Sequence, residues 1–447
     1  MKRIDPFILT GLAAILLVAG CRGLPATGEK AARQDVAAVG GQLQTNAPAL
    51  STNSTLRDCV LFAVRNHPQV IAAYADWAAS VENITVARSL PDPKLTFELY
   101  AADIVSSLMP GLMAEIPGPG KLSARAVAAS AESRAKYFQF ATTVQQTAFA
   151  VEKSFYPLHF LDAKLAVNRQ TMALLTSLEA LARTQNEVGQ GTLQDVLRAQ
   201  IEQEKLQTET ENLEDSRHVL LAQFKAALGL HVGQADPPVP TVAEFTETPW
   251  TEESLAIALG QNPKLKAMAA ELQAADASIR EARKEKIPDF TVGGEVDVKA
   301  SPFIWNPQLS MTLPIWRDKL AAKLANAQAG KRAAEARLSA EQIALVVNFT
   351  EQTYLIREAD RELKLLRERV LPRARQSLEI ARVAYRSSRV DFLNVIEDER
   401  SLLTLQLDEI AAQTRREVAR SELKLLIAGV PPENAPLLKT KTSKAAR

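Results

Sequence analysis

The sequence predicts a mainly α-helical protein with a small β part, built from two copies of one helix–strand–strand–helix–helix unit. Three observations support this fold class: long stretches rich in Ala, Leu, Glu, Gln, Lys and Arg, an aromatic content of only 5%, and an internal repeat. Such a composition is typical of long packed helices, in which helix-on-helix burial supplies the stability. We therefore expect two long helical hairpins and four short strands in each chain.

The charge composition argues against a polyanionic partner. The 53 basic and 52 acidic residues are finely mixed and leave a net charge of +1. Nucleic-acid binding usually needs basic residues clustered on one surface. We therefore expect no nucleic-acid partner.

The N-terminus, residues 1–20, has the pattern of an export signal. Lys2 and Arg3 precede an apolar stretch that is shorter than the ~20 residues of a membrane-spanning helix, and small residues precede Cys21. The pattern resembles a bacterial lipoprotein signal peptide, which implies that Cys21 becomes the lipidated first residue. An uncleaved anchor and an ordinary signal peptidase site are the alternatives. Residues 21–53 would then form a lipid-anchored linker.

An internal duplication covers most of the remaining chain, because shifts of 195 to 199 residues align the two halves. The aligned pairs include Pro68 with Pro263, Arg88 with Arg283, Lys121 with Lys319 and Val196 with Val395. We assign the repeats to residues 54–230 and 251–430. A linker, residues 231–250, would join them, and a basic tail, residues 431–447, would follow.

Each copy should begin with one helix and continue with two strands. The helices start near "LRDCVLFAVRNHPQV" and "EESLAIALGQNPKL" and stop before a proline, Pro93 or Pro288. The first copy then offers "KLTFELY" and "GLMAEIP", and in the second copy "PQLSMTLPI" alternates apolar and polar residues, as a strand with unlike faces does. A strand can span a membrane only within a closed barrel. Four strands are too few, so we expect three chains to pool twelve.

Two long helices follow the strands, over residues 121–188 and 319–386. Each would reach ~100 Å if continuous, which is too long for a compact domain. Pro157 and Pro372 should kink these helices or divide them. A return helix follows each one. Heptad spacing relates Leu206, Leu213 and Leu220 in the first return helix and Ile396, Leu403 and Ile410 in the second, which favours coiled-coil packing against the outgoing helix.

The turns of the two hairpins are "VGQGTLQDVLRAQ" and "SSRVDFLNVIEDE". Glycine permits a tight connection between antiparallel helices. If both turns lie at the far end of a helical tube, their side chains would line its aperture and the surface that a partner grips. The expected docking residues are Val188, Gly189, Gly191, Thr192, Ser387 and Ser388.

The duplicated plan, the "NHP" and "QNP" starts and the glycine-bearing turn resemble the TolC family of outer-membrane efflux proteins. The segment "EIPGPGKLSARA" is similar to the heavy-metal branch of that family, the CusC and CzcC type. The resemblance implies an outer-membrane homotrimer with a twelve-stranded β-barrel and a periplasmic helical tunnel (α-barrel). It further implies docking on an inner-membrane RND pump through a periplasmic adaptor, and passive conduction of exported metal cations.

The resemblance also implies a periplasmic gate. In that family, aspartates at two positions form rings at the constriction, and Asn394 and Glu397 occupy those positions here. Three copies of Glu397 would form a negative collar that attracts cations; a solvated helix face is the alternative. The gate residues implied in this way are Asp195, Tyr385, Arg389, Asp391, Asn394, Glu397 and Asp398.

No motif in the sequence predicts catalysis, a cofactor or a metal site. The four histidines are far apart, without ligand spacing such as i, i+4, and the methionines are scattered. We therefore expect a protein that is not an enzyme. Two other interpretations remain open: a periplasmic coiled-coil adaptor lipoprotein, and a structural spacer without a pore. A channel could also serve drug efflux or protein secretion instead of metal export.

Overall fold

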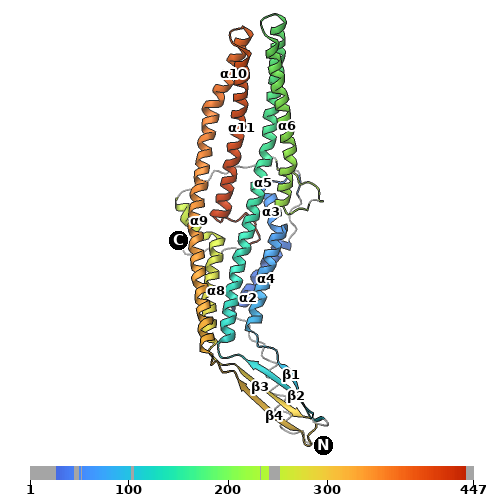
Figure 1. The fold of residues 1–447 in the computed structure, drawn as a ribbon, viewed down its shortest axis with the longest axis vertical. Helices are drawn as coiled ribbons and strands as arrows, with labels where there is room; N and C mark the ends of the chain where they lie inside the picture. The colour runs from blue at the N-terminus through green and yellow to red at the C-terminus, as the bar shows by residue number, and fades with distance from the viewer. Residues whose placement is uncertain are drawn as a thin grey trace. The chain divides into compact units, whose positions relative to one another are not determined.

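The computed structural model describes residues 27–44, 50–51, 53–101, 105–231, 233–240 and 252–438. These residues form two compact units (Figure 1). The first unit takes its residues from 1–39, 74–138 and 266–339, and the second from 40–73, 139–265 and 340–447. Both units therefore draw on both repeats.

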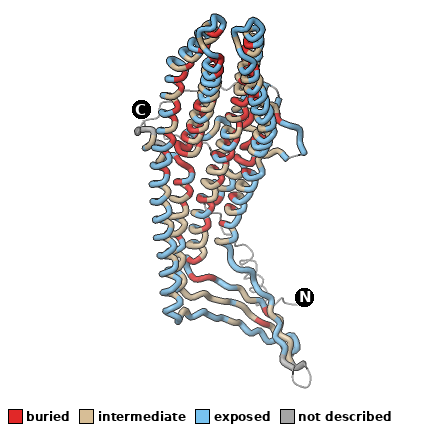
Figure 2. The backbone as a smooth tube through the Cα atoms, turned by 45° about the horizontal axis from the view of Figure 1, so that its top comes forward, coloured by how far each residue is buried: buried red, intermediate tan, exposed pale blue. Residues whose placement is uncertain are grey.

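The first unit contains a four-stranded antiparallel sheet in the order β1-β2-β3-β4 (Figure 1). The strands are β1 (Lys94–Ala101), β2 (Val105–Ile116), β3 (Phe290–Asp297) and β4 (Ile304–Met311). Each repeat contributes two of them, which confirms the predicted number. Figure 2 shows little burial along these strands.

The helices that contribute to the first unit are α2 (Thr27–Gln44), α4 (Pro68–Arg88), α5 (Lys121–Glu187), α8 (Pro263–Lys284) and α9 (Arg317–Leu365). The turn between β2 and α5 uses the "EIPGPGK" motif. The Gly118 N–H and the Lys121 ammonium both donate to Asp289, with distances of 2.7 and 2.8 Å to its Oδ1 atom. A Cβ at Gly118 would lie 2.4 Å from the Pro288 carbonyl oxygen. The motif therefore holds the end of β2 against the start of β3.

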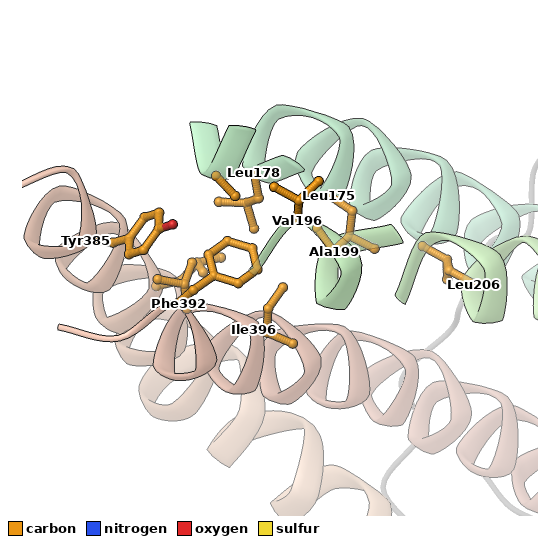
Figure 3. Packing of buried hydrophobic residues seen from close by; sticks show 11 residues of the cluster. Leu175, Leu178, Val196, Ala199, Leu206, Tyr385, Phe392 and Ile396 are labelled. Carbon is orange, nitrogen blue, oxygen red and sulfur yellow. The ribbon is translucent and has the colours of Figure 1, made fainter. Parts of the chain in front are cut away.

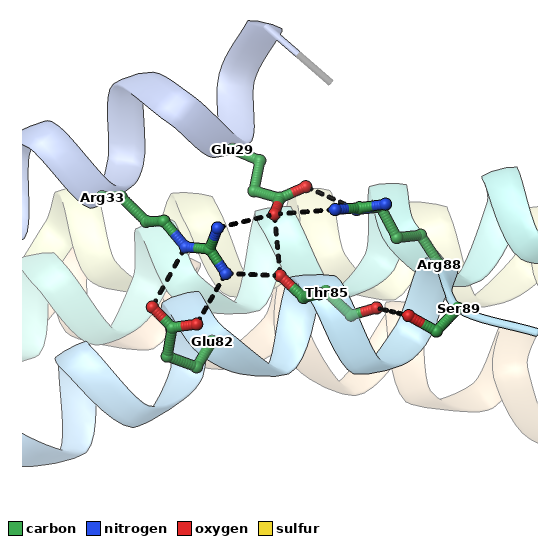
Figure 4. A network of polar contacts seen from close by, with 6 residues as sticks. All are labelled: Glu29, Arg33, Glu82, Thr85, Arg88 and Ser89. Atoms are coloured by element: carbon green, nitrogen blue, oxygen red, sulfur yellow. Dashed lines mark hydrogen bonds and ion pairs between the residues drawn. The ribbon is translucent and has the colours of Figure 1, made fainter. Parts of the chain in front are cut away.

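Helix α2 was not predicted, although it lies within the expected linker. It packs on α4 through Glu29, whose side chain is fully buried and accepts hydrogen bonds from Arg88 (2.6 Å) and Thr85 (2.7 Å) (Figure 4). Arg33 of α2 pairs with Glu82 of α4 at 2.6 Å. The hydrogen bond from Arg88 lowers the pKa of Glu29, although burial opposes it. The buried carboxylate is thus kept charged and paired.

The second unit contains two helical hairpins whose turns lie at the same end (Figure 1). One pairs α5 with α6 (Leu193–Ala227), and the other pairs α9 and α10 (Leu371–Arg386) with α11 (Phe392–Glu422). Short π-helical segments, η1 (Leu366–Val370) and η2 (Leu423–Ile427), precede α10 and follow α11. Helices α3 (Leu56–Asn66) and α7 (Glu252–Gln261) complete this unit.

The two prolines in the long helices have different effects. Pro157 lies inside α5, which continues through it as one helix, so the predicted division there was wrong. Pro372 follows η1, where the Leu371 N–H donates to the Leu366 carbonyl five residues back. The wider π turn accommodates Pro372, which has no backbone N–H to donate. The predicted join at Pro372 is therefore confirmed.

Each repeat opens with two helices, where the sequence predicted one. Pro68 begins α4 and Pro263 begins α8, and the residues before them, His67 and Asn262, leave helical geometry. Proline favours the first helical position and disfavours helix in the residue before it. The continuous helix expected at the start of each repeat was therefore wrong at this point.

His67 and Asn262 make equivalent bonds in the two repeats. Nδ1 of His67 and Oδ1 of Asn262 each accept from the backbone N–H two residues later, at 3.2 and 2.9 Å. The His67 ring also hydrogen-bonds the Ala226 backbone, and the Asn262 amide donates to the Leu426 carbonyl at 2.8 Å. Each side chain thus ties the second helix of its repeat to the end of the return helix.

Two glycines allow this close approach. Gly229 and Gly429 have φ of +76° and +64°, where glycine is unstrained. A Cβ at Gly229 would lie 2.9 Å from the His67 Cα, and one at Gly429 would lie 3.0 Å from the Asn262 Cα. The "NHP" and "QNP" segments are therefore the anchor points of the two return helices.

We expect His67→Asn to reduce the acid sensitivity of folding, and Asn262→His to increase it. Burial lowers the pKa of His67 below its ordinary 6.5, because the protonated ring is disfavoured and cannot accept at Nδ1. The contribution of neutral His67 to folding stability is therefore present above pH 6.5 and is lost as the pH falls through the lowered pKa. Denaturant unfolding of the three proteins between pH 8 and pH 5 measures this effect. Equal pH profiles would contradict it.

Candidate functional site

The two hairpin turns have the same backbone hydrogen bonds. At the first turn the Gln190 N–H donates to the Gln185 carbonyl at 2.8 Å, and at the second the Arg389 N–H donates to the Ala384 carbonyl at 2.9 Å. Both bonds close the end of the outgoing helix in the manner of a Schellman cap. The duplication thus extends to the geometry of the tips.

The two tips differ in the residue that adopts the left-handed conformation. Gly189 has φ +74°, and its counterpart 199 residues later, Ser388, has φ +56°. This conformation is unfavourable for a residue with a Cβ. The second tip therefore carries backbone strain that the first does not.

The return helices start with related caps. The Asp195 N–H donates to the Thr192 carbonyl and the Asn394 N–H to the Asp391 carbonyl, both at 3.1 Å. In the first repeat the Asp195 carboxylate also accepts from the Thr192 N–H at 3.2 Å. Val188 at the first tip is 61% exposed. At the second tip the Ser387 hydroxyl donates to the Ala384 carbonyl at 3.0 Å, and the Ser388 hydroxyl lies 3.5 Å from the Gln190 side-chain oxygen. The predicted docking residues therefore share one accessible end of the second unit.

A hydrophobic cluster below the tips joins the two hairpins (Figure 3). Helix α5 contributes three residues, α6 three, α10 two and α11 three. The members are Leu175, Leu178, Ala182, Val196, Ala199, Leu206, Leu378, Tyr385, Phe392, Val395 and Ile396. Leu206 and Ile396 belong to the predicted heptad series, so these positions pack as that spacing indicated.

The structure brings together two of the predicted gate residues, Asp195 and Tyr385. Tyr385 is 4% exposed, its ring contacts that of Phe392 in a tilted arrangement with centroids 5.1 Å apart, and its hydroxyl has no hydrogen-bond partner within 3.5 Å among the described residues. Burial, with the nearby Asp195 carboxylate adding to it, raises the pKa of Tyr385 to about 12. The phenol therefore stays neutral at physiological pH.

Among the described residues, none of the other predicted gate residues forms a side-chain hydrogen bond or ion pair with Asp195 or Tyr385. Arg389, Asp391, Asn394 and Glu397 are exposed, and Asp398 accepts from Ser377 at 2.8 Å. Their roles stay predictions, because a gate on a threefold axis would form between chains.

Sequence reasoning missed the polar groups that link the hairpins. Arg400 of α11 donates to Glu202 of α6 at 2.7 Å, and Gln185 of α5 donates to the Arg386 carbonyl at 3.4 Å. Glu399 is buried beside this ion pair. Glu202 and Arg400 are not counterparts in the two repeats, so the repeat alignment does not relate them and only the fold shows that they meet.

The sheet of the first unit has two unlike faces. Directly opposed residues of neighbouring strands share a face, and the strand register therefore assigns a face to the residues of the regularly paired part of the sheet. One face carries only apolar residues and glycine: Leu95, Phe97, Leu99, Leu108, Pro110, Leu112, Ala114, Ile116, Phe290, Val292, Gly294, Val296, Trp305, Pro307, Leu309 and Met311. Phe97, Trp305 and Leu309 on this face are 63%, 65% and 76% exposed. The apolar face is therefore uncovered in the single chain.

The opposite face of the sheet is largely polar. It includes Lys94, Thr96, Glu115, Asn306, Gln308 and Ser310. The Ser107 hydroxyl of β2 donates to the Asp297 carboxylate of the neighbouring strand β3 at 2.9 Å. An uncovered apolar face backed by a polar face is the pattern of a sheet placed between lipid and water.

Two further observations concern membrane and metal chemistry. None of the helices in the described parts of the chain combines the length and apolar character needed to cross a bilayer. The same residues contain no group of three His, Cys, Asp or Glu side chains suited to hold a metal ion. Cys59 is buried, and burial raises the pKa of its thiol to about 12, as expected of a structural cysteine. Cys21 lies outside the described residues.

Comparison with known proteins identifies a family. The sequence profile described as "Outer membrane efflux protein" matches residues 63–230 and 255–429, which lie within the two repeats. No curated protein matches the sequence. Among solved structures, a membrane protein from Pseudomonas aeruginosa superimposes with a TM-score of 0.74 at 20% identity, covering 83% of this chain and 90% of that one.

Two further structures share the fold. CusC superimposes with a TM-score of 0.71 at 15% identity, covering 86% of this chain and 96% of that one. The outer membrane protein VceC from Vibrio cholerae gives 0.70 at 16% identity, covering 83% and 96%. At these identities the similarity establishes the fold.

We expect Gly189→Ala to destabilise the first hairpin tip and Ser388→Gly to stabilise the second. A Cβ at Gly189 would meet no atom within 4 Å, so the cost is that of the left-handed backbone alone, about 1 kcal/mol. Hydrogen exchange of the tip amides measures both changes. Faster exchange in Ser388→Gly than in the parent would contradict this account.

Proposed function

Because this chain belongs to the outer membrane efflux protein family, we propose that it is a passive homotrimeric channel that carries solutes from the periplasm to the exterior as part of a tripartite efflux system. Its partners would be a periplasmic adaptor and an inner-membrane RND pump. Metal cations are the proposed cargo, and Cys21 would anchor each chain by its lipid. The activity needs no catalytic group, consistent with a transport protein that is not an enzyme.

One observation carries the proposal: the sheet has an apolar face and two unpaired edges. Strands β1 and β4 each have a single neighbour in the described chain. Unpaired backbone groups cannot remain in hydrocarbon, so edge strands must pair with those of other copies. Three copies would supply twelve strands, with the apolar face toward lipid and the polar face toward water.

The hairpin tips supply the proposed docking surface and aperture. Their exposed residues, from Val188 to Thr192 and from Ser387 to Arg389, would contact the adaptor. Glu397 is exposed on α11 close to the second tip, and three copies would form the negative collar at the constriction. The Asp195 and Tyr385 contact would help to hold it narrow.

The metal cargo is proposed from a single sequence motif. The "EIPGPGK" motif that suggested it has a structural role, because Gly118 and Lys121 bind Asp289. A channel for other solutes is therefore the second candidate. The adaptor alternative is disfavoured by the pair of hairpins and by the two-faced sheet.

The channel hypothesis predicts ion conductance from the purified protein in planar bilayers, and a heat-sensitive band at trimer mass. Replacing both Glu397 and Asp398 by neutral amides should reduce the preference for cations, because fewer negative charges would face the constriction. The ratio of cation to anion permeability measures this. A purified trimer without conductance, in the parent and the variant alike, would overturn the proposal.

The sheet predicts opposite outcomes for neighbouring residues. Leu309→Arg should impair assembly in the outer membrane, because arginine facing lipid costs about 2–4 kcal/mol at the bilayer midplane and less near the interfaces. Gln308→Arg, on the polar face, should be tolerated. The yield of heat-sensitive trimer in outer-membrane fractions compares the two. Equal yields would show that the apolar face does not meet lipid.

A further inference from the structure

Glu399 is a carboxylic acid buried where the two hairpins of one chain meet. It is 2% exposed and lies on α11 one turn beyond Val395 and Ile396 of the hydrophobic cluster. The structure describes no hydrogen bond to its carboxyl group. A buried ionised carboxylate without partners is strongly disfavoured, so the site favours the neutral acid.

The first repeat shows how the same position is satisfied. The counterpart of Glu399 is Gln200, whose amide donates to Glu179 of α5 at 2.9 Å. The counterpart of Glu179 in the second repeat is Leu378, which is 5% exposed within the cluster. The second hairpin therefore has an ionisable group where the first has a neutral amide, and an apolar side chain where the first has a partner.

An ion pair between the hairpins lies beside this group. Arg400 of α11 donates to Glu202 of α6 at 2.7 Å, and Glu202 is only 12% exposed. The charged groups that act on Glu399 are Glu202 from α6 and Arg400 from its own helix, and none from α5 or α10 does so. Burial raises the pKa of Glu399 to about 7, with Glu202 adding to the rise and Arg400 opposing it.

We propose that Glu399 and the Glu202–Arg400 ion pair form a proton-controlled latch that holds the two hairpins of one chain together near the periplasmic aperture. When Glu399 is neutral, Arg400 pairs with Glu202 alone, and the hydrophobic cluster between the two hairpins stays packed. When Glu399 ionises, a second carboxylate competes for Arg400 and repels Glu202. The neutral state therefore holds the hairpins more firmly.

The direction with pH follows from the raised pKa. The pKa of Glu399 is about 7 in the folded protein, above its ordinary value of 4.5. The contribution of the neutral acid to stability is therefore full below pH 4.5 and is lost as the pH rises from there through about 7. Separation of the hairpins should thus become easier in a neutral or alkaline periplasm. The effect on gating rests on the proposed channel function, whereas the latch itself does not.

Hydrogen exchange of the full-length trimer in detergent tests the latch. The relevant amides lie in residues 193–206 and 392–406. Comparing the parent with Glu399→Gln at each pH cancels the chemical pH dependence of exchange. From pH 5 to pH 8, the ratio of their opening rates should rise on the order of 10- to 100-fold, because the parent alone loses a proton. Glutamine already occupies the equivalent position 200, so this variant should fold.

Three further variants make the test specific. Asp408→Asn removes a charge from an exposed site on the same helix and should leave the profile unchanged. Glu202→Gln should move the transition to lower pH and Arg400→Gln to higher pH, shifts that a merely structural role would not produce. A ratio that does not vary with pH would overturn the latch. A pH-dependent ratio in a protein without conductance would keep the latch and overturn the proposed channel.

Discussion

The constraint on which the rest of the structure depends is that no backbone polar group can be left unpaired in hydrocarbon. The sheet presents a continuous apolar face, yet its order leaves β1 and β4 at the edges. A sheet of this kind is complete only as part of a larger closed one, so in the proposed trimer the chain is not an independent structural unit. The duplication fits this requirement, since each repeat supplies an antiparallel pair and the two pairs join through β2 and β3.

Much of this architecture could be predicted from the sequence because it is periodic. The alternation of Leu309 and Met311 with Gln308 and Ser310 indicated two faces, and the strand register agrees. The strands, hairpins and turns were predicted by patterns that repeat along the chain. Aligned prolines and glycines added the boundaries, because they restrict backbone geometry locally.

Features that depend on one long-range contact could not be predicted. Helix α2 is held by Glu29 and Arg88, which are remote in sequence. Pro157 stays inside a helix, because tertiary packing can outweigh a local preference. Glu399 resembles any other glutamate of a charged helix until its surroundings are known. The gate residues could be placed near the tips, but in the proposed trimer their partners would lie on other chains, which one sequence does not describe.

The two repeats have kept the same backbone while their side chains have diverged. His67 replaces the asparagine of the other copy, Ser388 replaces a glycine, and Glu399 replaces a glutamine. In a ring of three chains the six hairpins would have the same backbone outline. Only those of the second repeat would carry the strained Ser388 at the tip and the titratable Glu399 at the contact between hairpins. Divergence within the duplicated chain would thus reduce an apparent sixfold symmetry of the proposed trimer to a true threefold one, with chemically distinct hairpins alternating around the ring.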